Sequence, residues 1–244
     1  MNTGTGARAF VDFHCHTRAS FDSLASPVAV ARAAAKRGLT HLAITDHDRI
    51  DGALEARANA PDGLTVIVGQ EVKTTEGDLI ALFLERPVPS GLSPRDAIAA
   101  VREQGGLVGI PHPFDRFRGS LARGGAIAEI APLVDWIEAH NARLVGKGNE
   151  DAAAFAREHG LPGVAASDAH TVLEVGVAYT VLTGDPSTPA GLRAALASVE
   201  IVPGRASFLV RLMAPIAKLV QHLRGNGRGR ASRDGDRHRM AARR

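Results

Sequence analysis

Two histidines separated by one residue, His14 and His16, end an apolar segment rich in β-forming residues near the start of the chain. On an extended backbone, side chains two positions apart project to the same side, so both imidazoles can reach one metal ion. Imidazole nitrogens together with carboxylate oxygens suit Zn²⁺, Mn²⁺ and Fe²⁺. Further residues of these two types follow, each beside a Gly/Pro turn or at the end of a short apolar run: Asp46, His47, Glu71, His112, Asp168 and His170.

A lone His-x-His pair is weak evidence of metal binding, so the prediction depends on the whole set. Thr-Asp-His at 45–47, Glu71 after an apolar run, Pro-His-Pro at 111–113 and Ser-Asp-Ala-His at 167–170 follow it in order, which indicates one polynuclear metal centre. Cys15 is predicted to be a small buried side chain. Five histidines without this pattern are predicted not to bind metal: His41, His140, His159, His222 and His238.

The elements that position these residues repeat one arrangement, in which a helix, a glycine and a short apolar strand precede ligand-type residues. It occurs at 37–47, 105–112 and 159–170. Strands separated by single helices favour parallel pairing, and sites in such folds form where the carboxyl ends of the strands meet. Strands are expected at 39–44, 64–68, 78–84, 107–110, 134–139, 164–166 and 178–182.

The length of 244 residues is within the range in which a single α/β barrel is ordinary. Hydrophobic residues make up 45% of the chain and aromatic residues only 4%, so the core is expected to be aliphatic. The single cysteine excludes an intramolecular disulfide. No signal-peptide h-region and no run of 18 apolar residues is present. The sequence therefore predicts a soluble, cytoplasmic protein without membrane contact.

The positive net charge belongs to the C-terminal end of the chain. From Arg224 onward eight arginines face two aspartates, a net of +6, whereas the whole chain carries +3, so residues 1–223 sum to −3. The body is thus not a basic nucleic-acid surface. Residues 206–223 are predicted to be a helix or a kinked pair around Pro215, packed on the barrel. The Gly/Arg-rich segment 224–244 is predicted to be a disordered, solvated tail rather than a partner for RNA or acidic lipids.

Five motifs together resemble the polymerase and histidinol phosphatase (PHP) superfamily. They are HCHTxxSxD (14–22), AITDHD (43–48), GQE (69–71), IPHPFD (110–115) and ASDAH (166–170). The resemblance covers residues 9–205 and implies a distorted (β/α)7 barrel with a trinuclear centre of Zn²⁺, Mn²⁺ or Fe²⁺. It implies one ion held by His14, His16, Glu71 and Asp168, a second held by His112 and bridged by Glu71, and a third held by Asp22, His47 and His170.

The chain departs from the family pattern at the second ion, because residues 72–111 contain no histidine where many members have one. Asp78 either supplies an oxygen ligand there or is a turn aspartate that starts a strand. Asp46 is predicted to orient an imidazole rather than to act as the catalytic acid. Arg116 and Arg118 are predicted to contact phosphate, with surface salt bridges as the alternative, and Asn141 is a weaker candidate for substrate contact.

Two or three divalent cations can lower the pKa of a bridging water and neutralise phosphate oxygens, so the predicted reaction is phosphate ester hydrolysis by a bridging hydroxide. The expected substrate is a small phosphorylated metabolite or a nucleotide phosphate. The alternatives are an exonuclease, a 3′,5′-nucleotide phosphatase or a metal-binding module without turnover. Nucleic acid is not the favoured partner.

Overall fold

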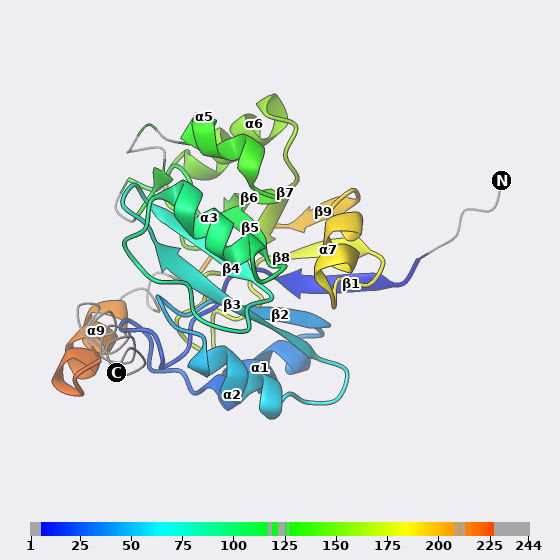
Figure 1. Ribbon diagram of the computed structural model, residues 1–244. Coiled ribbons are helices and arrows are strands. Elements are labelled where there is room, and N and C mark those ends of the chain that lie inside the picture. Colours follow the sequence, from blue (N-terminus) through cyan, green and yellow to red (C-terminus); the bar gives the residue numbers. More distant parts are fainter. Residues whose placement is uncertain are drawn as a thin grey trace, which may run out of the picture.

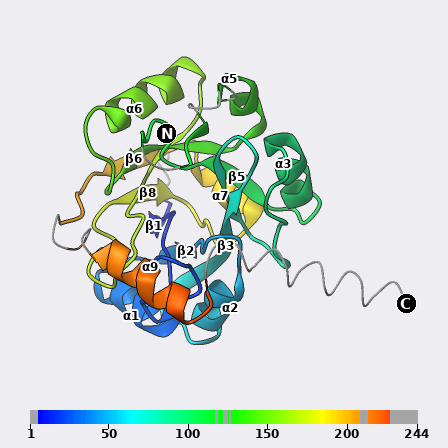
Figure 2. The same cartoon turned by 90° about the vertical axis from the view of Figure 1, so that its left-hand side faces the viewer.

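The computed structural model describes residues 6–116, 119–121, 125, 127–207, 210 and 213–226. In this part of the chain a nine-stranded sheet curls into a nearly closed barrel with helices outside it (Figures 1 and 2). The strands are β1 (Arg8–Asp12), β2 (His41–Ile44), β3 (Thr65–Lys73), β4 (Asp78–Leu82), β5 (Leu107–Ile110), β6 (Trp136–Asn141), β7 (Gly163–Ala166), β8 (Tyr179–Thr183) and β9 (Val199–Val202). The helices are α1 (Pro27–Lys36), α2 (Asp51–Ala58), α3 (Pro94–Arg102), α5 (Ile127–Ile130), α6 (Gly148–Glu158), α7 (Pro189–Ala195) and α9 (Met213–Leu223), with a short 3-10 turn η1 (Ala131–Leu133).

The sheet has the order β7-β6-β5-β4-β3-β2-β1-β8-β9 and combines parallel and antiparallel pairs. β1, β2 and β3 are parallel to one another, and so are β5, β6 and β7. β4 is antiparallel to both of its neighbours, β3 and β5. The link of residues 74–77 between β3 and β4 is too short for a parallel crossover. β8 is antiparallel to β1 and to β9. Six strands therefore bring their carboxyl ends to one end of the barrel.

The distorted barrel predicted from the sequence is confirmed, with two local differences. β9 was not among the predicted strands. β3 continues to Lys73, so Glu71 lies inside a strand and not after it, paired with Ile80 of β4. The expected single-helix connections hold for β1–β2, β2–β3, β4–β5 and β6–β7.

The barrel closes at two places: β7 contacts β8, and the segment after β1 contacts the segment after β7. The Ala165 N–H donates to Thr180 Oγ1 at 2.8 Å, which joins β7 to β8. The His16 N–H donates to the Ala169 carbonyl at 2.8 Å, beside a parallel bridge between Cys15 and Ala169. The two segments that carry the first and last predicted ligands thus lie side by side.

The core has two buried layers and is largely aliphatic, as the composition predicts. Inside the barrel, the Phe13 and Trp136 rings pack 5.5 Å apart among Val, Leu and Ile side chains. Gly109 makes room for the indole, since a Cβ at this position would lie 2.1 Å from Trp136 Cε2. A second layer fills the space between the sheet and the outer helices. These aromatic rings pack inside the barrel, below the loops at the carboxyl ends of the strands.

Helix α9 crosses the end of the barrel where the carboxyl ends of the strands meet (Figure 2). The buried amide of Gln221 donates to the carbonyls of Arg18, Ser20 and Ser23 at 2.7, 3.0 and 2.7 Å, which fixes the loop after β1. Pro215 lies in the first turn, where proline is tolerated, so α9 is one unbroken helix. The predicted disorder of 224–244 falls mostly on 227–244, outside the described residues.

None of the helices in the described part of the chain combines the length and the apolar character that crossing a membrane would require.

Candidate metal centre

His14 and His16 leave β1 with their imidazoles directed at each other. Both residues are buried, and their Nε2 atoms lie 2.9 Å apart. Cys15, between them, is buried on the other face, as predicted. Two donor atoms that share an ion with bonds of about 2.1 Å lie roughly 3.0 Å apart at an octahedral angle and roughly 3.4 Å apart at a tetrahedral one. The spacing of the two nitrogens is close to the lower value.

Two carboxylates face this histidine pair. Glu71 Oε2 lies 3.4 Å from the Nε2 atom of each histidine. Asp168 Oδ1 lies 3.8 Å from His14 Nε2 and 3.6 Å from His16 Nε2. The structure thus brings together the four residues that the resemblance assigns to one ion, and the Glu71 distances equal the tetrahedral donor spacing.

His112 lies on the side of the Glu71 carboxylate that faces away from the His14–His16 pair. Its Nε2 is 3.2 Å from Glu71 Oε1, whereas the other oxygen of this carboxylate faces the histidine pair. A carboxylate in this position can bridge two cations. His112 also shares a donor group with His14 and Asp168, in which the candidate ligand atoms lie within 4.8 Å of one another.

Asp22 organises the third group, on the loop beneath α9. Its Oδ2 lies 3.3 Å from the Nε2 atoms of both His47 and His170. His16 joins these three residues in a single donor group, so the third set adjoins the first. His47 is also 3.0 Å from Glu71 through Nδ1, which connects all three predicted sets.

The charges around these donors favour a cation. Burial alone would lower the pKa of His14, but the carboxylates of Glu138, Asp168 and Glu71 raise it well above its usual value. Burial opposes ionisation of Glu71, yet the neighbouring histidines, His47 first, hold the pKa of Glu71 well below its usual value. The cluster therefore stabilises positive charge, whether a proton or a metal ion carries it.

His16 has the opposite shift. Burial, together with the neighbouring histidines His170 and His47, lowers the pKa of His16 well below its usual value, which keeps the imidazole neutral and able to donate a lone pair. Asp22 Oδ1 and His112 Nδ1 are buried and have no hydrogen-bond partner among the described residues. The donor types, their spacing and these unsatisfied atoms fit divalent cations.

Glu138 is a supporting residue that the sequence analysis missed. It is fully buried on β6, and its Oε1 lies 2.7 Å from His14 Nδ1, on the ring side away from His16. Its Oε2 accepts hydrogen bonds from the His112 N–H at 2.8 Å and from Asn141 Nδ2 at 3.0 Å. The signal in the sequence is a single glutamate inside the apolar run 136–139, where a charge requires a partner.

Asn141 has a positioning role within the centre. Its Nδ2 donates to Glu138 at 3.0 Å and to Asp168 Oδ2 at 3.1 Å, and the side chain is fully buried at the end of β6. The substrate contact predicted for Asn141 stays a prediction.

Asp46 is connected to the His16 imidazole through the hydroxyl of Ser20. Its Oδ1 accepts from the Ser20 hydroxyl at 2.6 Å, and Ser20 Oγ lies 3.0 Å from His16 Nδ1. Both Asp46 oxygens also hold Thr17, through the N–H at 2.6 Å and the hydroxyl at 2.7 Å. The contact is indirect, since the serine hydroxyl lies between the carboxylate and the ring, and the orienting role of Asp46 stays a prediction.

Two candidate ligands have a positive φ, a backbone conformation that residues other than glycine rarely adopt. His112 has a φ of 27° and Asp168 a φ of 51°. Such conformations cost on the order of 1–3 kcal/mol each and gather at functional sites. The contact of the His112 N–H with Glu138 helps to hold the first of them.

The other predicted site residues stand apart from these groups. Asp78 begins β4 and is buried with its carboxylate against Gly119, and it belongs to none of the donor groups found among the described residues. The structure therefore favours the turn aspartate over the ligand. Arg116 is exposed on the loop after His112, and Arg118 lies outside the described residues. His41 contacts Ser187, and His140 contacts the Gly204 carbonyl.

A largely buried arginine, Arg143, lies on the loop after β6 and flanks the centre. Arg143 Nε lies 3.6 Å from Glu174 Oε1, and its side chain is only 10% exposed. Arg143 Nη1 is buried without a hydrogen-bond partner in the described part of the chain. Glu174 in turn accepts the His170 N–H at 3.1 Å, so the ion pair adjoins the third donor group.

Comparison with known proteins places this site in a family. The PHP domain model matches residues 12–131, and the PHP-associated model matches residues 146–200. An uncharacterised protein of Methanocaldococcus jannaschii is 40% identical over 114 residues, which cover 42% of this chain and 67% of that protein. A 5′-3′ exoribonuclease of Haemophilus influenzae is 31% identical over 162 residues, which cover 60% of this chain and 55% of that protein.

The fold has solved counterparts. A two-domain protein of Bacteroides vulgatus, described as containing a predicted PHP-like metal-dependent phosphoesterase, superposes with a TM-score of 0.69 at 19% identity. The match covers 84% of this chain and 67% of that one. With the PHP domain model matched over residues 12–131 and the PHP-associated model over residues 146–200, the chain belongs to the PHP family.

Proposed function

We propose that this protein is a hydrolase of phosphate esters that uses two or three divalent cations, Mn²⁺, Zn²⁺ or Fe²⁺, and that its substrate is a small phosphorylated metabolite or a nucleotide phosphate. One observation carries the proposal. Eight ionisable side chains from the carboxyl ends of five strands form overlapping donor groups with ligand spacing. Membership of the PHP family supports the same reaction class.

Some side chains of this centre would bind the cations, and others would orient the side chains that bind them. His14, His16, Glu71 and Asp168 would hold one cation, His112 and Glu71 a second, and Asp22, His47 and His170 a third. Bound there, the cations would lower the pKa of a water molecule and neutralise charge on the phosphate oxygens. Hydrolysis consumes this water: its oxygen joins phosphorus, the ester P–O bond breaks, and the leaving oxygen takes a proton.

The residues around the donors prepare them for this task. Glu138 would accept a hydrogen bond from the Nδ1–H of His14, which would leave the lone pair of Nε2 to face the cation. Asn141 directs Asp168, and Ser20 with Asp46 directs His16. Arg116, which is exposed on the loop after His112, is our candidate for contact with phosphate.

A second function is favoured by the similarity to the exoribonuclease of Haemophilus influenzae. A nuclease would act on phosphodiesters, whereas a phosphatase acts on monoesters. The negative charge of residues 1–223 argues for the smaller substrate, because nucleic-acid binding depends on neutralising phosphates with cationic side chains.

The test compares the Mn²⁺-loaded protein with its His16→Ala and Asp168→Asn variants on a panel of phosphate monoesters and one phosphodiester. Both variants should lose hydrolysis while they keep the circular dichroism spectrum of the barrel. The matched control is His159→Ala, which removes an exposed histidine at the end of α6. Undiminished turnover in a folded Asp168→Asn protein would contradict the proposal, and turnover of the diester alone would favour the nuclease.

A further inference from the structure

An apolar pocket lies beside the third donor group. It is an open pocket of about 170 Å³ between the loop after β1, the loop after β7 and helix α9. Leu24, Val172, Met213 and Ala217 contribute to its apolar wall, and Asp22 and His170 line it next to the donors. Helix α9 contributes Met213, Ala214 and Ala217 to the lining of the pocket, and Gln221 fixes the helix to the loop that carries Asp22.

We propose that this pocket binds an apolar leaving group, aryl or alkyl, of the phosphate ester. The inference rests on the proposed function and names the substrate class for the same site. A phosphoryl group held by the donor cluster would lie next to Asp22 and His170, and these two residues also line the pocket. The group attached to phosphorus through the ester oxygen can therefore enter the pocket.

The wall of the pocket selects against polar leaving groups. Its exposed surface is mostly apolar, so a polyhydroxylated group would lose hydrogen bonds to water without replacement. An apolar group would instead exchange water for contact with Leu, Val and Met side chains. The volume is sufficient, because a cavity of roughly 150 Å³ accommodates benzene.

The polar residues of the pocket mark where the ester joins the cluster. Asp22 is 6% exposed, and its Oδ1 has no hydrogen-bond partner among the residues described. Its Oδ2 faces His47 and His170. The carboxylate thus lies at the boundary between the donors and the apolar wall, which is the place that a reacting ester must span.

The experiment compares kcat/KM for benzyl, hexyl and glycerol 1-phosphates, which share a primary alcohol as the leaving group. Benzyl and hexyl phosphates should be preferred by about tenfold or more. Val172→Asn and Leu24→Asn, each at a side chain that is 37% exposed, should reduce this preference about tenfold. The matched control is Leu173→Asn, since Leu173 is 65% exposed and does not line the pocket. A difference between benzyl and hexyl phosphates separates aryl from alkyl specificity.

Binding of benzylphosphonate, which is not an ester, is measured by calorimetry in parallel. Equal hydrolysis of all three esters, or the same preference in Val172→Asn, Leu24→Asn and the wild type, would overturn the inference and leave the proposed function standing. If no ester is hydrolysed but Val172→Asn weakens benzylphosphonate binding and Leu173→Asn does not, the pocket is supported and the proposed function fails. Phosphonate binding that both asparagine variants leave unchanged also counts against the pocket.

Discussion

Replacing Glu138 by glutamine tests how the centre is assembled. Glu138 offers Oε1 to His14 Nδ1 and Oε2 to the His112 N–H and Asn141 Nδ2. Glutamine has nearly the same shape but only one acceptor oxygen. If its NH₂ group faces His112 and Asn141, the His112 N–H and the Asn141 amide lose their acceptor, because a donor then stands opposite both. If the NH₂ group faces His14, it requires a lone pair on Nδ1 and moves the ring proton to Nε2, the atom that faces the cation.

Either orientation of the glutamine weakens metal binding by a predictable amount. Loss of a partner that orients a ligand lowers metal affinity about 10- to 100-fold, which corresponds to roughly 1.4–2.7 kcal/mol. The measurement is the metal retained per chain after dialysis against graded free Mn²⁺. The half-saturation concentration of Glu138→Gln should rise by the same 10- to 100-fold factor.

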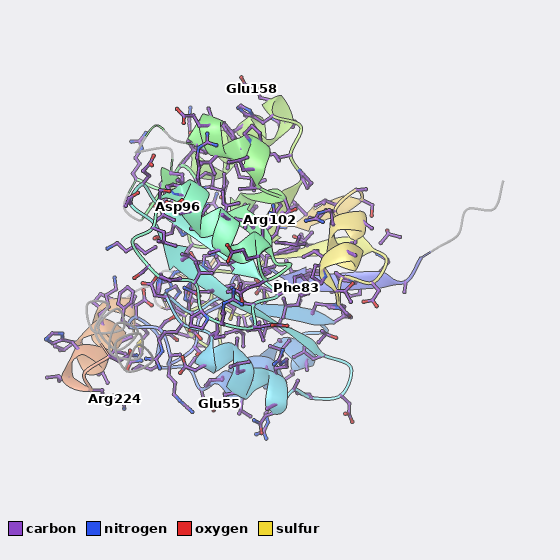
Figure 3. All side chains as sticks on the ribbon, in the orientation of Figure 1. Glu55, Phe83, Asp96, Arg102, Glu158 and Arg224 are labelled. Atoms are coloured by element: carbon purple, nitrogen blue, oxygen red, sulfur yellow. The ribbon has the colours of Figure 1, made fainter. Side chains whose placement is uncertain are left out.

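The matched control is Glu158→Gln, because Glu158 is exposed at the end of α6, on the outside of the barrel (Figure 3). It removes the same charge from the chain without touching the donors. A Glu138→Gln protein that is folded and saturates at the wild-type Mn²⁺ concentration would refute the reasoning about the His14 tautomer.

Three further predictions follow from other contacts. Removing divalent cations with a chelator should lower the thermal unfolding midpoint, because cations that bind only the folded chain stabilise it; a midpoint that does not change would argue against bound metal. Gly109→Ala should lower the free energy of unfolding by about 2–3 kcal/mol in denaturant titrations, because the new Cβ would meet the Trp136 indole at 2.1 Å, and a neutral effect would contradict this packing. Asp46→Asn should reduce Mn²⁺ affinity about tenfold, because one of the two oxygens that accept hydrogen bonds from Ser20 and Thr17 is replaced by an NH₂ donor; the same dialysis measures this affinity, and an unchanged value would count against the route through Ser20.

The donor set was predictable from the sequence because its members stand where apolar strands end. His14, His47, His112 and Asp168 each follow a short buried strand, and parallel strands bring such positions to one edge. This rule required only the type of each element and its direction. It did not require the exact length of a strand, which explains why the extension of β3 past Glu71 did not affect the prediction.

The supporting residues could not be predicted in the same way. Glu138 lies on a strand in no recognisable spacing with His14, which is 124 positions away, so only the barrel closure shows the contact. The role of Asp46 depends on the rotamer of Ser20, which the sequence does not determine. Asp78 had two interpretations because sequence gives the residue type but not the direction of the side chain, and the structure turns it towards Gly119.

The anchoring of α9 matters for how this protein is handled in the laboratory. Gln221 joins the loop after β1 across about 200 positions of sequence, and this loop carries Asp22. A purification tag or a truncation that disturbs α9 therefore acts on the opposite end of the polypeptide. Activities measured on shortened or tagged proteins will report the state of this anchor together with the effect of the residues removed.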